Sequence, residues 1–563
     1  MWKCLALSLL LAHSALSQEL ADLVLRGGTI HTVDDAIGTV RALAARDGRV
    51  LAVGDEAAVA DLIGPSTEVI ELEGRTVVPG FIEGHGHFLG MGEFAQVLDL
   101  TQARTWDDII RLVADAAAEA PAGTWVVGRG WHQEKWDARP SPDVEGFPTH
   151  DLLSSLTPDH PVSLTHASGH AAFFNRRAMQ MAGIDADTTA PAGGEILHGP
   201  DGEPCGVFRE TAASLVERVR TADLSRRSPP QIRADLRRAA ALAAEECLRN
   251  GVTSFQDAGT PFSQLGALEE LAAEGNLPVR LWVMVRDSAT RIEREFADRR
   301  TKRAGDSYLT IDAVKLTIDG ALGARGAWLL EPYADSASST GLGRMEDLER
   351  LAKFCAEVRT QFCVHAIGDR ANREALDVFE AVLDGRDDPT ARRFRIEHAQ
   401  HLSPADIPRF AELGVIAAMQ GIHCTSDAPY VIDRLGEGRA REGAYAWRSL
   451  LDAGAVIVNG TDAPVERIDP IASFAASVTR RASDGSRFFP EQCMTRIEAL
   501  RSYTRDAAYG AFEEDIKGTL TPGKFADLVV LSQDILTVPD EEIMQTRVLV
   551  TVVGGEVRYR RAE

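Results

Sequence analysis

Short apolar runs alternate with longer, helix-like stretches through the middle of the chain. Eight of these runs have the length and composition of buried strands, and the stretches between them are long enough to hold helices. They cover residues 76–82, 252–256, 279–285, 313–318, 362–365, 394–397, 415–419 and 455–459. Eight such units predict an α/β fold with a (β/α)₈ barrel. A doubly wound sheet is the alternative, but no GxGxxG fingerprint follows any of these strands.

The two ends of the chain have a different pattern, in which short apolar runs are separated only by turns. Asp47-Gly48 lies between two such runs and predicts a β-hairpin. Near the other end, Pro522-Gly523-Lys524 precedes a further series of strand-like runs. We expect residues 18–76 and 520–563 to pair into one composite β-sandwich domain, with residues 77–519 forming the barrel between them.

The first two predicted barrel strands are separated by far more residues than one helix needs. We therefore expect an inserted subdomain at about residues 90–235, after barrel strand 1. An insertion at the end of a barrel strand projects from the face where barrel active sites form, so it could cover the site. It contains four tryptophans: Trp106, Trp125, Trp131 and Trp136.

The N-terminus has the pattern of a cleavable signal peptide. Lys3 gives a positive charge, residues 5–16 are mostly apolar, and Ala15-Leu16-Ser17 fits the small-x-small cleavage rule. The apolar run is too short to cross a membrane. We expect residues 1–17 to be removed and the protein to be secreted or periplasmic; a buried N-terminal strand is the alternative.

Composition narrows the classes of partner. The hydrophobic fraction of 45% and the charged fraction of 26% are ordinary for globular proteins, but the formal net charge is −24. An acidic surface repels nucleic acid and anionic membranes, so we expect neither as a partner. No later stretch has the length and hydropathy of a transmembrane helix. A small-molecule substrate remains, and the chain could form a homo-oligomer.

The seven cysteines include no CxxC pair, which argues against a thiolate zinc site. One disulfide is possible in an oxidising compartment, but the sequence does not assign it.

The strongest chemical signal is a strand that runs directly into Gly84-His85-Gly86-His87. Residues at i and i+2 of an extended strand point the same way, so the two imidazoles can bind one divalent ion. A histidine pair of this kind is common by chance, and its place at a strand end is what makes it informative.

Other ligand-type residues stand at the ends of other predicted strands. They are Lys315, His365, His398 and Asp462. Each has an ordinary structural explanation: a satisfied core histidine, a lysine that extends to solvent, or a helix N-cap. Together with His85 and His87 they place six ligand-type side chains on five strand ends, which predicts a metal site at one face of the barrel.

With these motifs, the chain resembles the amidohydrolase superfamily, and more narrowly its YtcJ-like branch, amidohydrolase family 3. The resemblance covers nearly the whole chain after residue 17. It is carried by residues 79–87, Lys315 with 319–323, 365–372, 395–400 and 460–465, and in the insertion by 168–170, Asn175, 193–195 and 206–207. One departure is Glu83, where many members of the superfamily have aspartate.

The resemblance implies roles for these residues. His85 and His87 bind the more buried ion, and a carboxylated Lys315 bridges two ions. His365 and His398 bind the second ion, and Asp462 contacts the water that attacks the substrate and acts as general base. The ligand types favour zinc, as two ions or as one. His170 is our candidate for a catalytic or substrate contact from the insertion, and Trp131 and Arg325 are weaker candidates for substrate binding.

The favoured function is metal-dependent hydrolysis of a non-peptide carbon–nitrogen bond in an uncharged or modestly sized amide, of N-acyl or formamide type. Hydrolysis of an ester, lactone or carbamate is the alternative, because the same ligands could serve it. A metal-binding or ligand-binding protein without catalysis is a third hypothesis, since a fold does not fix a function.

Overall fold

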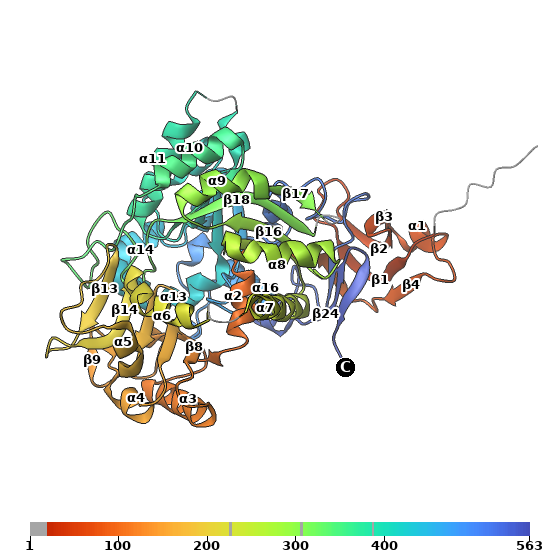
Figure 1. Ribbon diagram of the computed structural model, residues 1–563. Coiled ribbons are helices and arrows are strands. Elements are labelled where there is room, and N and C mark those ends of the chain that lie inside the picture. Colours follow the sequence, from red (N-terminus) through yellow and green to blue (C-terminus); the bar gives the residue numbers. More distant parts are fainter. Residues whose placement is uncertain (1–19, 225–227, 305–307, 386–387, 563) are drawn as a thin grey trace, which may run out of the picture.

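The computed structural model describes residues 20–224, 228–304, 308–385 and 388–562 (Figure 1). The predicted signal peptide, residues 1–17, lies outside these ranges.

Eight parallel strands form a nearly closed barrel, which confirms the predicted fold class. Their order around the barrel follows the chain, and β22 lies against β6 to bring the two ends together. The strands are β6 (Phe81–Gly86), β15 (Val252–Thr260), β16 (Arg280–Val285), β18 (Leu309–Thr317), β19 (Gln361–Ala366), β20 (Arg395–His398), β21 (Ile416–Gln420) and β22 (Ile457–Gly460).

Helices follow the strands and cover the barrel. In α11, alanine, leucine, phenylalanine and valine side chains at helical spacing are buried, while the charged positions between them face outward. The helices of this region are α7 (Pro229–Arg249), α8 (Phe262–Ala273), α9 (Ala289–Arg299), α10 (Leu348–Val358), α11 (Asp369–Leu383), α12 (Ile407–Glu412), α13 (Gly421–Leu435), α14 (Glu437–Gly443), α15 (Trp447–Asp452), α16 (Pro470–Thr479), α17 (Arg496–Ser502) and α18 (Arg505–Gly510).

The prediction of one strand over residues 76–82 was wrong in one respect, because this run is divided at Gly80. Residues before it form β5 (Thr76–Pro79), which pairs with the chain ends, and residues after it form β6 of the barrel. A side chain at Gly80 would come within 2.1 Å of the Thr253 hydroxyl. Glycine therefore lets the chain pass from one sheet to the other at a point of close contact.

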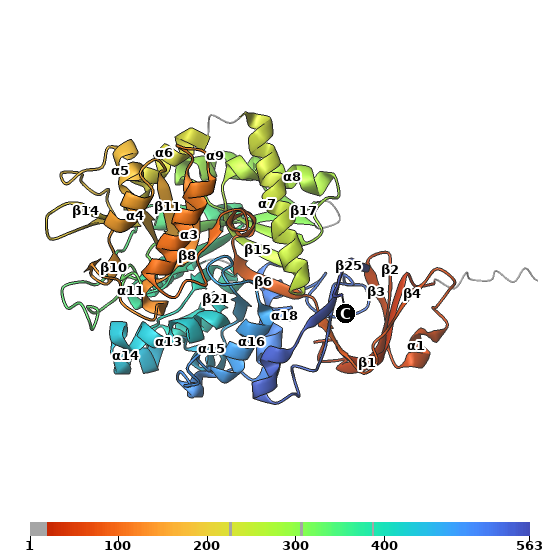
Figure 2. The ribbon, with the colours of Figure 1, turned by 90° about the horizontal axis from the view of Figure 1, so that it is seen from below.

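Both ends of the chain share one eight-stranded sheet beside the barrel (Figure 2). Its order is β25-β24-β23-β5-β1-β2-β3, with β4 paired to β1. The predicted hairpin joins β2 and β3 through Asp47 and Gly48, which both have positive φ. The strands are β1 (Leu23–His31), β2 (Thr39–Arg46), β3 (Arg49–Gly54), β4 (Glu68–Glu71), β23 (Leu528–Leu531), β24 (Val548–Val553) and β25 (Glu556–Arg560).

The long segment between β6 and β15 has a sheet of its own, with the order β13-β14-β12-β11-β8-β7. Helix α3 (Trp106–Glu119) packs its apolar face on this sheet, and α2 (Phe88–Phe94) packs on α7 beside the barrel. The strands are β7 (Leu98–Asp99), β8 (Val126–Trp131), β11 (Val162–His166), β12 (Ala171–Phe174), β13 (Gly194–His198) and β14 (Pro204–Glu210).

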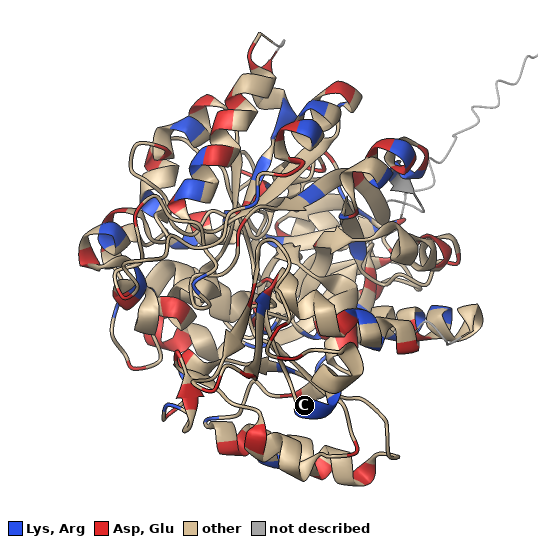
Figure 3. Cartoon of the chain, turned by 60° about the vertical axis from the view of Figure 1, so that its left-hand side comes forward, with Lys and Arg blue, Asp and Glu red and all other residues tan. Residues whose placement is uncertain are grey.

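Acidic and basic residues are interspersed over the outer helices (Figure 3). Within the described part of the chain, no helix combines the length and the apolar composition needed to cross a bilayer. The six cysteines of the described ranges all have free thiols.

Candidate metal centre

A cavity of about 920 Å³ lies between the barrel and the inserted segment. It is lined by side chains from the carboxyl ends of barrel strands, which is where barrel enzymes place their catalytic groups. The predicted ligands reach it from five strands: His85, His87, Lys315, His365, His398 and Asp462. The structure therefore brings all six to one space.

His85, His87 and Asp462 form the first of two groups with the geometry of a metal site. Asp462 Oδ1 lies 3.5 Å from His85 Nε2 and 3.2 Å from His87 Nε2. One ligand atom from each residue lies within 4.8 Å of the other two. His85 lies on β6 and His87 directly follows that strand, while Asp462 follows β22, the strand that closes the barrel against β6.

Asp462 also belongs to the second group, with His398 and His423. His398 ends β20, and its Nδ1 lies 2.8 Å from the Gln420 side-chain oxygen. Asp462 and His398 both have a positive φ, of 57° and 76°. A positive φ at a residue other than glycine costs free energy and is found most often at functional sites. Here it directs these two side chains into the cavity, at a cost in stability.

A buried ion pair behind His85 fixes the orientation of its ring. The Glu397 carboxylate receives a hydrogen bond from His85 Nδ1, and Arg395 Nε donates to the other Glu397 oxygen at 2.8 Å. Although burial opposes it, the charges of Arg395 and His85 hold the pKa of Glu397 below its ordinary range. Burial also lowers the pKa of His85 to about 4, so the ring is neutral at pH 7 and Nε2 is free to accept a cation.

Lys315 and His365 face the cavity from the neighbouring strands β18 and β19. Burial lowers the pKa of Lys315 to about 8, which increases its neutral, nucleophilic fraction. His365 Nε2 lies 3.4 Å from Asp319 Oδ1. The Asp319 carboxylate also accepts three backbone N–H bonds, from Ile367, Gly368 and Trp328, at 2.8–3.0 Å.

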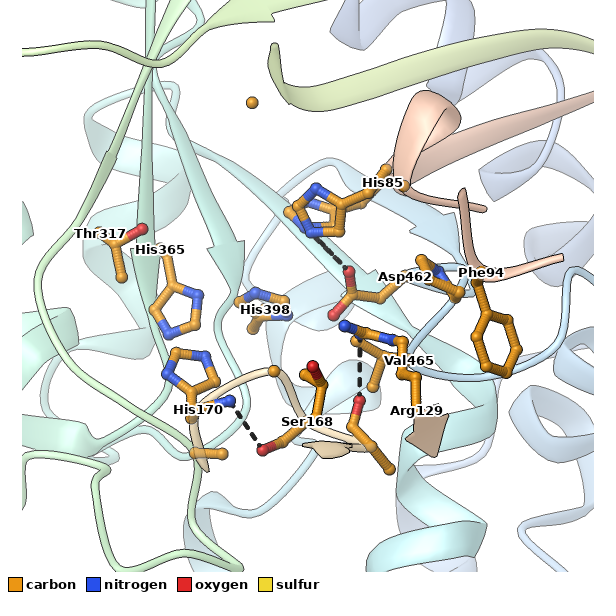
Figure 4. A pocket seen from close by; sticks show the side chains of 18 of the residues that line it. His85, Phe94, Arg129, Ser168, His170, Thr317, His365, His398, Asp462 and Val465 are labelled. Atoms are coloured by element: carbon orange, nitrogen blue, oxygen red, sulfur yellow. Dashed lines mark hydrogen bonds and ion pairs between the residues drawn. The ribbon is translucent and has the colours of Figure 1, made fainter. Parts of the chain in front are cut away.

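His170 reaches the same space from the inserted segment (Figure 4). Its ring centroid lies 5.0 Å from that of His365, and its Nδ1 lies 3.0 Å from Glu210 Oε2. Glu210 packs against a barrel loop so closely that a side chain at Gly320 would come within 2.0 Å of its Oε1. The contact fixes the inserted segment to the barrel beside the candidate metal site.

Two predicted substrate contacts are not brought to this cavity. Trp131 is fully buried in the core of the inserted segment, and its indole N–H donates to the Leu164 carbonyl at 2.9 Å. Arg325 turns to an ion pair with Asp335 at 2.9 Å. Neither side chain lines the cavity.

The structure adds residues that were not selected from the sequence. Glu397 and Asp319 lie inside the motifs that carried the family resemblance, so their position was a signal, but their partners were not visible. His423 lies in the first turn of α13, and Arg129 lies on β8 of the insertion. Neither stands in a pattern that distinguishes it from a structural residue.

The residues present fit a divalent cation. The described part of the chain offers no hydrogen-bond partner to four buried atoms that face this site: His85 Nε2, His365 Nε2, His423 Nε2 and Asp462 Oδ1. Buried polar atoms are normally satisfied, so three unpaired imidazole nitrogens and a carboxylate oxygen that face one space indicate a cation as the missing partner. Imidazole nitrogens with a carboxylate oxygen suit zinc and similar ions.

Comparisons with known proteins agree with this geometry. Residues 68–559 match the sequence model of the Amidohydrolase family. The chain is 31% identical to the putative amidohydrolase YtcJ of Bacillus subtilis, over 95% of this chain and 99% of that protein. It is 27% identical to an N-substituted formamide deformylase of Arthrobacter pascens, over 96% and 99%. A crystal structure of a metal-dependent hydrolase from Pyrococcus horikoshii OT3 superposes with a TM-score of 0.73 at 26% identity, over 92% and 99%.

Proposed function

The chain belongs to the amidohydrolase family, and on that premise we propose that it hydrolyses a non-peptide carbon–nitrogen bond of the N-acyl or formamide type. The observation that carries the proposal is the position of Asp462, a carboxylate shared by two histidine groups at the mouth of the barrel. A relative that spans almost the whole chain is named as a deformylase of N-substituted formamides, which supports the bond type.

The side chains of the site have different roles in such a reaction. A bound divalent ion supplies Lewis-acid activation of water and of the scissile carbonyl. His85, His87, His365 and His398 would hold it, with Asp462 as a carboxylate ligand. Asp462 accepts the proton of the attacking water and returns it to the leaving nitrogen. His170, which is hydrogen-bonded to Glu210, is our proposed contact to the substrate from the inserted segment.

We further propose that the site would hold two zinc ions per chain, with Lys315, carboxylated to a carbamate, as one of the residues that hold them. The lowered pKa of Lys315 supports this, because the neutral amine is the form that reacts with carbon dioxide. Metal analysis should give about two equivalents, and mass spectrometry under native conditions should show the added carbon dioxide. One equivalent with unmodified Lys315 would contradict the two-ion arrangement and leave a mononuclear site.

The function is tested by a hydrolysis screen of N-formyl and N-acyl amines and amino acids with metal-loaded and chelated protein. Hydrolysis that is lost on chelation and restored by zinc is the expected result. Asp462→Asn should lower kcat by about 10²–10⁴-fold, the usual contribution of a general base, while much of the metal is retained. Turnover equal to that of the wild type would remove Asp462 from the mechanism.

Ester, lactone or carbamate hydrolysis is the second candidate function, because the same ligand set serves all of them. Matched ester and amide substrates with one acyl group decide between them by their kcat/KM ratio. Absence of turnover on both, with tight metal binding, would favour a non-catalytic protein. Export stays a prediction, and N-terminal sequencing of the protein from the native cell tests it.

A further inference from the structure

Arg129 lies on the cavity face of the inserted sheet because of a local irregularity in β8. Thr165 pairs with Arg129, but the next residue of β11, His166, pairs with Trp131, so Gly130 is an extra residue in the strand. Gly130 has a φ of 105°. A bulge of this kind re-aims the side chains on its two sides. Arg129 therefore faces the metal site, whereas Trp131 turns into the core behind it.

The Arg129 guanidinium has few partners in the protein. Its Nη2 donates to the Ala167 carbonyl at 3.3 Å, and its Nε is buried without a hydrogen-bond partner in the described ranges. Gly169 leaves room beside it, since a side chain there would come within 3.7 Å of Nη2. Guanidinium has five N–H donors, so most of them remain for a ligand.

Three other cations that line the cavity have a carboxylate partner, whereas the arginines Arg129 and Arg286 have none within 4.0 Å in the described ranges. Lys135 Nζ lies 3.1 Å from Glu466, Arg220 Nε lies 2.6 Å from Glu217, and Arg344 Nη2 lies 3.8 Å from Glu210. Burial lowers the pKa of Arg129, and the charge of Asp462 offsets this only in part, so an anionic ligand would relieve the remaining cost of the buried cation.

The residues around Arg129 indicate where a substrate would carry the anionic group that Arg129 binds. The charge of Asp462 acts on the Arg129 guanidinium, and Val465 and Phe94 line the same cavity (Figure 4). Val127, two residues before Arg129 on β8, also lines the cavity, as does Leu89. The anion is thus close to the reacting centre and is flanked by apolar surface.

We propose that Arg129 binds a carboxylate of the substrate, which makes the preferred substrates N-acyl compounds with a carboxylate near the scissile amide and an apolar substituent beside it. N-acylated apolar amino acids have this form. The planar guanidinium suits a carboxylate, because two parallel N–H bonds can reach its two oxygens. The inference rests on the proposed amide hydrolysis and narrows the class of amide.

The test uses two substrates that differ only in the carboxylate: N-acetylphenylalanine and N-acetyl-2-phenylethylamine, each with metal-loaded full-length protein. Wild type should favour the first in kcat/KM. Arg129→Gln should lower kcat/KM for N-acetylphenylalanine by about 10- to 100-fold, mainly through KM, and change that for the neutral amide by less than about threefold. Arg129→Lys, which keeps the charge, should retain part of the preference.

Arg220→Gln is the matched control, because Arg220 is an arginine of the same segment that has its own carboxylate; it should keep the preference for the carboxylate. Circular dichroism and metal content establish that each variant is folded and loaded. An equal fall on both substrates would overturn the proposal and assign Arg129 to the scissile carbonyl instead. Equal kcat/KM of wild type on the two substrates would also overturn it, while leaving amide hydrolysis in place.

If neither compound is cleaved, amide hydrolysis is judged by the wider screen, and the inference about Arg129 is still tested. Both compounds are then stable ligands, and calorimetry gives their dissociation constants for wild type and Arg129→Gln. Binding of N-acetylphenylalanine that is about 10-fold or more weaker in the variant supports a carboxylate site. Equal affinity in the two proteins refutes it.

Discussion

Substitution of Glu397 by glutamine should weaken metal binding although Glu397 is not a ligand. In the wild type, the Glu397 carboxylate accepts hydrogen bonds from both Arg395 and His85 Nδ1. A glutamine side chain has one oxygen and one NH₂ group, so it can satisfy only one of these donors. With its oxygen on Arg395, its NH₂ group faces His85 Nδ1 and favours the tautomer that carries hydrogen on Nε2, the atom that faces Asp462.

The expected size follows from the role of such partners. Loss of a carboxylate behind a metal-binding histidine lowers metal affinity about 10- to 100-fold, or about 1.4–2.7 kcal/mol. We expect this range for Glu397→Gln, measured by competition with a chromophoric zinc chelator. The variant should also unfold more easily, because Arg395 is completely buried and loses its charged partner. Arg395 retains the Gly84 carbonyl as a partner at 2.8 Å, which favours folding of the variant.

Glu83→Gln is the matched control. Glu83 is another fully buried carboxyl on β6, but it accepts a hydrogen bond from the Thr461 backbone, and burial raises its pKa to about 8. It is therefore mostly neutral at pH 7, and an amide replaces it with little electrostatic change. We expect its metal affinity to stay within about threefold of wild type, well inside the range assigned to a true partner of a metal ligand. If Glu397→Gln binds zinc as tightly as Glu83→Gln does, the assigned role of Glu397 is refuted.

Three further outcomes are open to direct measurement. The pKa of Glu83 rises from 4.5 to about 8 on folding, so between these pH values the folded chain holds a proton that the unfolded chain releases. The free energy of unfolding should therefore fall from pH 4.5 to 8 by up to about 1.4 kcal/mol per pH unit. Glu83→Gln should flatten this slope in urea titrations of chelated protein. Gly130→Ala places a side chain 2.5 Å from the Thr101 methyl group and strains a positive φ. The melting temperature of this variant should fall, and the substrate preference attributed to Arg129 should weaken. Gly123→Ala, where a side chain meets open space, should keep that preference. Zinc at about 100 times its dissociation constant should stabilise the chain by about 2.7 kcal/mol, and an unchanged melting temperature would argue against a site that exists only in the folded state.

The barrel could be predicted because each of its strands is a short apolar run bounded by longer helical stretches. The candidate ligands could be selected because they stand at the ends of those runs, where parallel strands converge. The division at Gly80 could not be predicted, since both halves of the run are equally apolar and only the approach of Thr253 separates them.

The substrate-binding wall was harder to predict for a definite physical reason. Strand alternation puts Arg129 and Trp131 on one face, and the extra residue at Gly130 moves them to opposite faces. The sequence therefore favours Trp131 as a cavity residue, although it is Arg129 that lines the cavity. The partners of Glu397 and Asp319 were hidden for a similar reason, because contacts between distant strands leave no local pattern.

The shared sheet at the chain ends also bears on how the protein is made. Val78, just before the first barrel strand, pairs with Val529, near the end of the chain. β5 can pair with β1 early, but the ribosome must synthesise the whole stretch between Val78 and Val529 before β5 can pair with its second neighbour, β23. Such distant pairing makes folding slow and keeps apolar strand edges exposed while synthesis continues. We expect the nascent chain to depend on chaperones until its last strands emerge, and expression yield to fall sharply when β23 to β25 are deleted.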